Sequence, residues 1–398
     1  MNTIPTIFNG GPASYTAVGG TERRSSTGLS AVILSRGGRY PRYGLFEELG
    51  KTGFDYILSI ESSFTRYDLE ALSLDFPFVR FILLKEAVSP GEEINLAAAE
   101  LSSPLFFVLW NDLRILRGGG AERMAERLLS SAGTQSQSFD NKGIYKRLCT
   151  VPLIQNGRSE TMPTLITPAL LPEGNHVRQF TNGRTGWAFS PGSAIKAIPL
   201  IPRREGLPSL YPFDGIGIYD RERFIRVGGF DSSIQSFHWQ LMDFGFRSSL
   251  WGEEIAATQL IKLSYEGAIA PEDSTAGEGS HRFFLKNLAP VFRGDYAHIP
   301  LRRFFGYYKR KGGDLFAAWE EFSAARDWVK TNRYRFTSDA RTIAERWETL
   351  DLTGGPEGES ERLGPDDPFE KDGASEKDVG SVRGGASGKD GPSGRDVM

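Results

Sequence analysis

The sequence predicts an α/β fold: a mixed, mainly parallel sheet with helices on both faces, followed by a helical C-terminal extension. Short β-branched runs alternate with helical segments between residues 30 and 116, which is the pattern of strand–helix–strand units. From residue 281 to about residue 350 the pattern is helical throughout. Apolar residues make up 39% of the 398 residues, enough to bury a sizeable core.

Each element follows from a local pattern. Buried strands are expected at residues 30–35, 54–62, 78–86 and 104–116, the last broken at Asn111–Asp112. Helices are expected at residues 43–53, 66–76 and 90–102; the third has a proline and acids in its first turn. A helix and a polar loop should fill residues 118–150. Residues 315–331 form the clearest amphipathic helix of the extension.

The chain divides into four expected parts. Residues 1–28, rich in glycine, serine and threonine, should form a flexible arm. Residues 29–300 form the α/β domain, in which residues 151–211 are expected to build flaps over a site. Residues 301–352 are the helical extension. Residues 353–398 have too few apolar side chains to offset chain entropy, which predicts a disordered tail.

Composition excludes several classes of protein. A net charge of −3 and a pI near 6.0 disfavour nucleic acid as the partner, since phosphate neutralisation needs a basic face. The single cysteine, Cys149, rules out a disulfide framework and is expected to be a buried small side chain. The start of the chain carries no basic head followed by an apolar run. We therefore expect a cytoplasmic protein.

Two carboxylates fall where strands end. Glu61 closes the second expected strand and Asp112 the fourth. Ligands of open parallel sheets bind at the carboxyl ends of the strands, and a carboxylate there can hold a divalent ion that neutralises phosphate. The alternative is that Asp112 only caps a turn and Glu61 is only solvated.

The order of four segments resembles a known family. The segments are "AVILSRGG", "FDYILSIESS", "SPGEEINLAAAELSSPLFFVLWNDL" and "RERFIRVGGFDSSIQSFHWQLMDFGFRSSLWG". Over residues 30–293 they resemble the family 2 glycosyltransferases of the GT-A fold. The resemblance implies a GT-A-like domain over residues 29–300. It also implies inverting transfer of a sugar from a nucleoside-diphosphate sugar to a glycan or lipid-linked acceptor.

The resemblance assigns roles to particular residues. Glu61, Asn95 and Asp112 would contact the nucleotide sugar, and Asp112 would also hold Mn²⁺ or Mg²⁺. Asp243 would be the catalytic carboxylate. The acceptor would lie against a set of five residues, namely Gly229, Phe230, Asp231, His238 and Trp239.

The sequence departs from the family at two positions. Trp110 stands where Asp-x-Asp has its first carboxylate, and Leu241 stands where the family has its general base. Three alternatives follow: Asp243 takes the base role after a local shift, His238 supplies it, or the protein binds a sugar nucleotide or glycan without catalysis. Asp243 and Arg247 are also spaced as a helical i, i+4 ion pair.

Residues 301–313, "LRRFFGYYKRKGG", interleave basic and aromatic side chains. This composition is typical of a helix that lies on an anionic membrane surface. Peripheral contact with the inner face of the membrane would suit a lipid-linked acceptor. The alternative is that the aromatic side chains face inward and the basic ones are solvated.

Overall fold

The computed structural model describes residues 13–20, 22–36, 43–62, 68–133, 147–155, 167–172, 195–200, 202, 205–267 and 272–349. All of them lie within the first of two units of the chain, Met1–Thr353. The predicted disordered tail and the first twelve residues of the predicted arm lie outside the described residues, as does most of the predicted flap region.

The centre of the main sheet is parallel. Its strands pair in the order β4-β3-β2-β5, with Ala31 opposite Ile57 and Ile57 opposite Val79. Every residue of β2, β3 and β5 is buried, so both faces of these strands are covered. The strands are β2 (Leu29–Leu34), β3 (Ile57–Glu61), β4 (Val79–Leu84) and β5 (Leu105–Trp110).

Three helices connect the parallel strands: α1 (Tyr43–Gly50), α2 (Leu69–Asp75) and α3 (Pro90–Glu100). Helix α3 begins with a capping box, in which the Ser89 backbone N–H donates to the Glu92 carboxylate at 2.9 Å. Glu92 is one of the two acids that the sequence places in the first turn of this helix. The cap fixes the start of α3, which turns Glu93 and Asn95 to the buried side.

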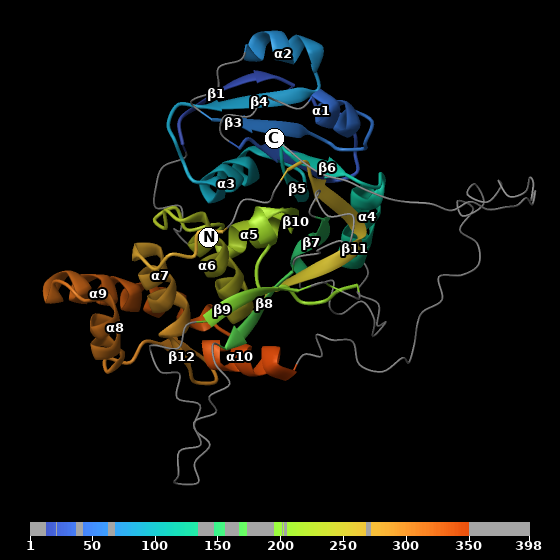
Figure 1. The fold of residues 1–398 in the computed structure, drawn as a ribbon. Helices are drawn as coiled ribbons and strands as arrows, with labels where there is room; N and C mark the ends of the chain where they lie inside the picture. The colour runs from blue at the N-terminus through green and yellow to red at the C-terminus, as the bar shows by residue number, and fades with distance from the viewer. Residues whose placement is uncertain are drawn as a thin grey trace, which may run out of the picture. The chain divides into compact units, whose positions relative to one another are not determined.

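The sheet continues beyond β5 with mixed pairing. Strand β10 runs antiparallel to both β5 and β7, and β11 runs parallel to β7, in the order β5-β10-β7-β11-β6. Figure 1 shows these strands continuing the stack from the blue end of the sheet. They are β6 (Leu113–Ile115), β7 (Arg147–Gln155), β10 (Gly217–Asp220) and β11 (Glu254–Tyr265), while β8 (Thr167–Pro172) and β9 (Ile195–Leu200) form a separate hairpin.

The helices of this half are α4 (Gly120–Gly133), α5 (Arg221–Val227) and α6 (Phe237–Leu250), with a short 3₁₀ turn, η3 (Phe213–Gly215), ahead of β10. Helix α6 packs against α3, η3 and β11. The predicted mixed α/β sheet covered on both faces is therefore confirmed.

The N-terminal arm needs a correction. We predicted that residues 1–28 are flexible, but Tyr15–Gly19 form strand β1, which pairs antiparallel with β4 along the edge of the sheet. The alternation in "YTAVG" was too weak to indicate a strand. The edge of β4 supplied the pairing that the local sequence did not predict.

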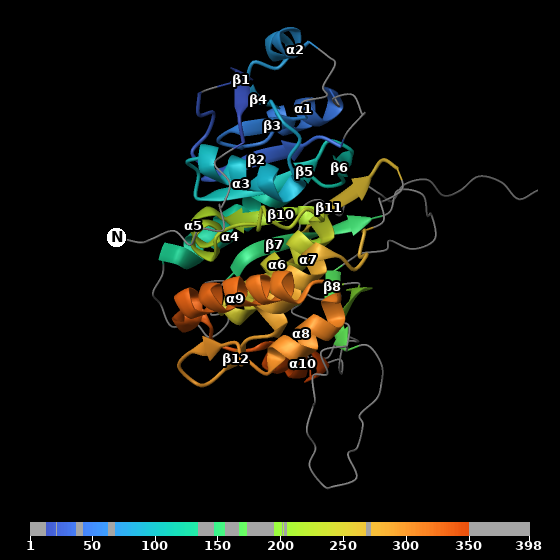
Figure 2. The same cartoon turned by 90° about the vertical axis from the view of Figure 1, so that its left-hand side faces the viewer.

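The helical C-terminal extension is also confirmed, and Figure 2 shows α8, α9 and α10 at the opposite end of this unit from β1. The chain passes through α7 (Glu278–Phe283), a π-helical turn η4 (Phe284–Leu288), and the short strands β12 (Val291–Phe292) and β13 (Ala297–His298). It then forms α8 (Arg303–Lys311), α9 (Leu315–Asn332), η5 (Arg333–Arg335) and α10 (Ala340–Thr349). Among the described helices, none is long and apolar enough to cross a bilayer.

Gly245 allows helix α6 to pack closely against the backbone of Leu210, and a substitution can test this contact. A Cβ at Gly245 would lie 2.1 Å from the Leu210 carbonyl oxygen, a backbone atom that cannot move aside cheaply. We expect Gly245→Ala to lower the free energy of unfolding by about 3 kcal/mol or more, measured by denaturant titration. The matched control is Gly44→Ala in α1, where nothing lies within 4 Å. A gain of about 0.5–1 kcal/mol is expected there. Equal stability of the two variants would contradict the packing.

Candidate functional site

One cluster lies at the carboxyl ends of β2 and β5, and we call it the edge cluster: Arg36, Trp110, Asp112, Asp214 and Tyr265. Arg36 follows β2 and places its guanidinium 4.1 Å from the centroid of the Trp110 ring. Its Nε lies 3.1 Å from Asp112 Oδ2, and its Nη2 donates to Asp214. A single arginine therefore joins two carboxylates from distant parts of the chain.

Asp214 is held in a costly conformation. Its φ of 54° lies in the left-handed region, where a non-glycine residue needs support from its surroundings. Trp110 Nε1 donates to its carbonyl at 2.8 Å, and the Tyr265 hydroxyl donates to its carboxylate. Burial raises the pKa of Asp214 to about 6, although Arg36 opposes the shift. The edge cluster can therefore change its charge near neutral pH.

Glu61 ends β3 and is buried. The Ser35 hydroxyl donates to one of its oxygens at 2.9 Å, and the Ser59 hydroxyl donates to the other. Glu93, from α3, lies near enough to feel its charge. Burial raises the pKa of Glu93 to about 8, with repulsion from Glu61 adding to the effect. The structure thus places a second acid, missed by the sequence analysis, beside the predicted nucleotide contact.

The predicted metal ligand, Asp112, faces a guanidinium. A divalent ion at its Oδ2 would be repelled by Arg36 unless the arginine moved away. Within the described ranges, acidic, histidine and cysteine side chains do not gather in threes that could hold a metal ion. These residues, as arranged, do not fit a resident ion. Arg36 is the cation at these carboxylates.

Asn95 has a structural task that differs from the predicted nucleotide contact. Its Nδ2 donates to the Phe230 carbonyl at 2.8 Å, and its Oδ1 accepts from the Phe230 N–H at 2.9 Å. Gly229, at φ 63°, makes this approach possible, because a Cβ there would lie 2.2 Å from Asn95 Oδ1. The Phe230 ring stacks on Phe244 in the core. Asn95, Gly229 and Phe230 therefore lock the turn to α3 rather than face a ligand.

Asp231 and Asp243 meet in a buried charge network with Arg247, Lys286 and Asn287. Lys286 Nζ lies 2.7 Å from Asp231 Oδ2 and 3.0 Å from Asp243 Oδ1. Arg247 Nη2 and Asn287 Nδ2 donate to Asp243 at 2.9 and 2.8 Å. Burial alone would raise the pKa of Asp243, but Lys286 and Arg247 outweigh it and hold the pKa below its usual value.

This network encloses Asp243, which we predicted to be the catalytic carboxylate. Its side chain is 0% exposed, and its carboxylate already accepts bonds from three partners. To act as a base on an acceptor hydroxyl, Asp243 would have to leave these partners. Asp231, predicted to bind the acceptor, is likewise buried against Lys286. The predicted i, i+4 pair of Asp243 with Arg247 is present.

A second cluster, which we call the histidine cluster, consists of Tyr211, His238 and Glu272. His238 Nδ1 lies 3.1 Å from Glu272 Oε2, and the Tyr211 hydroxyl donates to the same oxygen at 2.7 Å. Trp239 is half-buried beside it, with its Nε1 donating to the Thr275 carbonyl at 2.9 Å. Of the predicted acceptor residues, His238 and Trp239 are the ones outside the turn and the charge network.

The edge cluster and the histidine cluster lie close together because residues 211–214 contribute to both. Tyr211 of the histidine cluster and Asp214 of the edge cluster flank the start of η3. The ring of Phe237, the residue before His238, lies 6.3 Å from the ring of Trp110. Arg36 could have been suspected, because it directly follows a strand. Asp214 and Glu272 carry no such signal, because distant elements bring them to the site.

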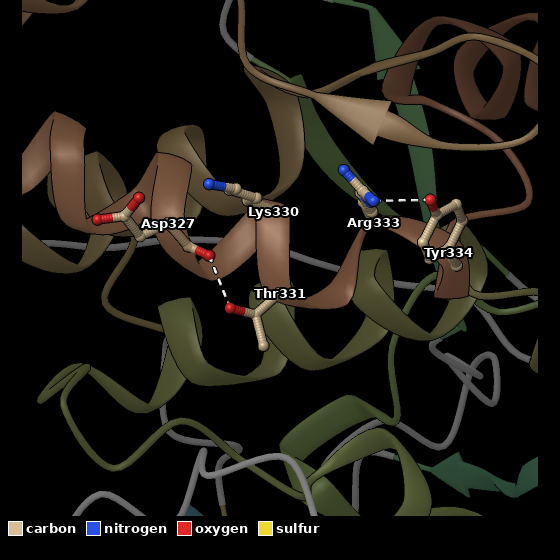
Figure 3. A pocket seen from close by; sticks show the side chains of 5 residues that line it. All are labelled: Asp327, Lys330, Thr331, Arg333 and Tyr334. Carbon is tan, nitrogen blue, oxygen red and sulfur yellow. Dashed lines mark hydrogen bonds between the residues drawn. The ribbon is translucent and has the colours of Figure 1, made fainter.

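A third feature is an open surface hollow on α9 and η5, drawn in Figure 3. Its lining is polar and includes Asp327, Lys330 and Arg333, and the Arg333 guanidinium donates to the Tyr334 hydroxyl at 2.7 Å. None of the residues predicted from the sequence lies there.

Comparison with known proteins gives likenesses of structure alone. No protein-family model and no curated protein matches the sequence. The chain is similar to GalNAc-T7 solved with UDP, GalNAc and Mn²⁺: identity is 12%, coverage is 76% of this chain and 57% of that one, and the TM-score is 0.47. It is also similar to S. aureus TarS 1–349 in complex with UDP, with 10% identity, coverage of 75% and 70%, and a TM-score of 0.40.

Both similar proteins are glycosyltransferases of the GT-A fold. The chain spans little more than half of the GalNAc-T7 chain, 57% of its length. At such identities and TM-scores a likeness assigns neither activity nor site residues.

Glu93 gives a test of the buried acids. Its pKa of about 8, against an ordinary 4.5, means that the folded state binds more protons between these values. The free energy of unfolding should therefore fall as pH rises from about 5 to 8. We expect Glu93→Gln to remove this loss, which raises stability at pH 8 by roughly 2–4 kcal/mol and changes it little at pH 5. Denaturant titrations at both pH values measure it. Glu126→Gln, on an exposed part of α4, is the control, and a pH-independent effect of Glu93→Gln would contradict the prediction.

Proposed function

We propose that this protein transfers a sugar from a nucleoside-diphosphate sugar to a glycan or lipid-linked acceptor, with inversion. The observation that supports this is the gathering of Arg36, Glu61, Asp112 and Asp214 at the carboxyl ends of parallel strands. Ligands of open α/β sheets bind at this edge. A partly buried cation and acceptors for a nucleoside are the groups that such a donor requires.

Each group has a defined task in this proposal. Glu61 accepts a hydrogen bond from the nucleoside in exchange for one from Ser35 or Ser59, because its buried carboxylate is bonded to both hydroxyls in the free protein. Arg36 has five N–H donors and, within the part of the chain that the structure describes, uses only some of them on Asp112 and Asp214, which leaves others for the diphosphate. Because the pKa of Asp214 is about 6, proton uptake there can remove one negative charge as the diphosphate arrives. The leaving group is stabilised by a fixed guanidinium.

A second candidate is a non-catalytic protein that binds a sugar nucleotide or a glycan. Two observations favour it: Leu241 is buried in the core, and Asp243 is locked in the charge network. Neither position of the family's catalytic segment offers a carboxylate to an acceptor. Binding without turnover is the behaviour that distinguishes this candidate.

We also propose that residues 301–313 contact an anionic membrane, which suits a lipid-linked acceptor. In α8, Phe304 and Tyr307 are buried, whereas Phe305 is 75% exposed. Arg302 and Lys309 are exposed and share the helix face of Phe305, at spacings of three and four residues. An exposed aromatic between two cations fits a lipid interface.

Nucleotide binding tests the donor site. UDP and UDP-N-acetylglucosamine are the probes, since the similar structures were solved with them. We expect a saturating probe to raise the melting temperature by about 3 °C or more, and Arg36→Gln to abolish the shift, because it removes the cation proposed to bind the diphosphate. The control is Asp327→Ala in the hollow of Figure 3, which should keep it.

The same scan with EDTA or Mn²⁺ tests the cation. Because Arg36 is already in place, the shift should persist in EDTA. A shift that appears only with Mn²⁺ would return the metal to Asp112, and no shift under any condition would count against both candidates.

Vesicle binding tests the membrane contact. Phe305→Ser should weaken sedimentation of the protein with phosphatidylglycerol vesicles about tenfold, because the exposed ring is lost from the interface. Tyr334→Ser, at an aromatic 69% exposed on η5, is the matched control and should bind like the wild type. Equal binding to phosphatidylcholine and phosphatidylglycerol would contradict a role for the basic residues.

A further inference from the structure

We infer that His238 is the general base of the proposed transfer and that Glu272 is its positioning residue. This inference rests on the proposed function. Nδ1 of His238 lies 3.1 Å from Glu272 Oε2, and an imidazole that donates from Nδ1 to a carboxylate leaves the lone pair of Nε2 free to accept a proton. No described residue bonds to Nε2. Histidine backed by a carboxylate is a general arrangement for base catalysis.

The orientation of the imidazole is fixed from several sides. Tyr211 donates its hydroxyl to the same Glu272 oxygen at 2.7 Å, which holds the carboxylate in place. The His238 ring lies edge-on to Tyr211 and to Trp239, with centroids 6.2 and 5.1 Å apart. With 9% of its surface exposed, His238 has little freedom to change rotamer but keeps an outlet to solvent. A base held in this way loses little entropy when an acceptor binds.

The position of His238 also suits the reaction. It is the second residue of α6, and its neighbour Phe237 contacts Trp110 of the edge cluster. Trp239 next to it is only partly buried, and flat aromatic rings cover the apolar face of a sugar. The acceptor would therefore lie between a sugar platform and the cation that stabilises the leaving diphosphate.

Two carboxylates of the adjoining turn and of α6 are already occupied. Asp231 and Asp243 share the ammonium of Lys286, and Leu241 at the family's base position is buried. If either aspartate accepted a proton from a substrate, Lys286 would lose a counter-charge in the core. His238 can accept one beside a carboxylate that stabilises the imidazolium.

The chemical step is balanced. The acceptor hydroxyl gives its proton to Nε2 of His238 as its oxygen forms a bond to the anomeric carbon. The bond from that carbon to the diphosphate oxygen breaks, and its electron pair leaves with the nucleoside diphosphate beside Arg36. The imidazolium is paired with Glu272 until it returns the proton to water. Attack opposite the leaving group inverts the anomeric centre.

The test separates binding from turnover. The full chain is assayed with UDP-N-acetylglucosamine and UDP-N-acetylgalactosamine, with water and methyl glycosides as acceptors, and UDP release is followed. Binding of each donor is measured separately by thermal shift. The variants are His238→Gln, His238→Gly and Glu272→Gln, and the control is His281→Gln on α7.

We expect His238→Gln to lower kcat about 100-fold or more while KM for the donor changes less than about threefold. Glu272→Gln should lower kcat about tenfold. Added imidazole should restore turnover in His238→Gly, which a merely structural role would not allow. His281→Gln should retain wild-type turnover.

Four results would overturn the inference. If His238→Gln keeps full turnover, the base lies elsewhere while the proposed function stands. If the wild type binds a donor but releases no UDP, both the base and the transferase proposal fail and the binding protein remains. If no donor binds, the donor site fails as well. Lost turnover without imidazole rescue, together with a lower melting temperature of the His238 variants, would assign His238 to packing.

Discussion

The buried ammonium group of Lys286 holds together three segments of this half of the molecule. Lys286 lies between Asp231 and Asp243 and so ties the turn after α5, helix α6 and the π-helical turn η4 to one point. The π-helical turn places Asn287 on Asp243 as well. Removing one residue of this network would leave a buried charge without a partner, at a cost of several kcal/mol. Each residue therefore holds the others in place. This network explains why Asp243 is completely buried.

The edge cluster follows the same logic, with the guanidinium of Arg36 between two carboxylates. Arg36 joins Asp112 to Asp214, whose backbone is strained. Trp110 stacks on the guanidinium and donates to the Asp214 carbonyl.

The sequence predicted the elements well and the contacts poorly. Strand and helix patterns are local, so the parallel strands and α3 with its cap could be read from residue order. The edge cluster and the histidine cluster depend on Asp214 and Glu272, which reach the site only through tertiary packing. The burial of Asp243 could not be predicted from the sequence either. The residue matches a motif, but the groups that surround it in the fold determine its chemistry. Likewise, β1 exists because β4 offered an edge.

The pairing of β1 with the edge of β4 affects how the chain can be shortened. Strand β4 alternates buried and half-buried positions in "VRFILL", and β1 satisfies its outer row of backbone groups. A chain shortened to start at Leu29, the first strand that is evident from the sequence, would expose this apolar edge. Such an edge is a template for pairing with another chain. Residues 15–19 therefore keep the edge of β4 from pairing with another chain. We expect a protein without these residues to aggregate rather than to lose its fold.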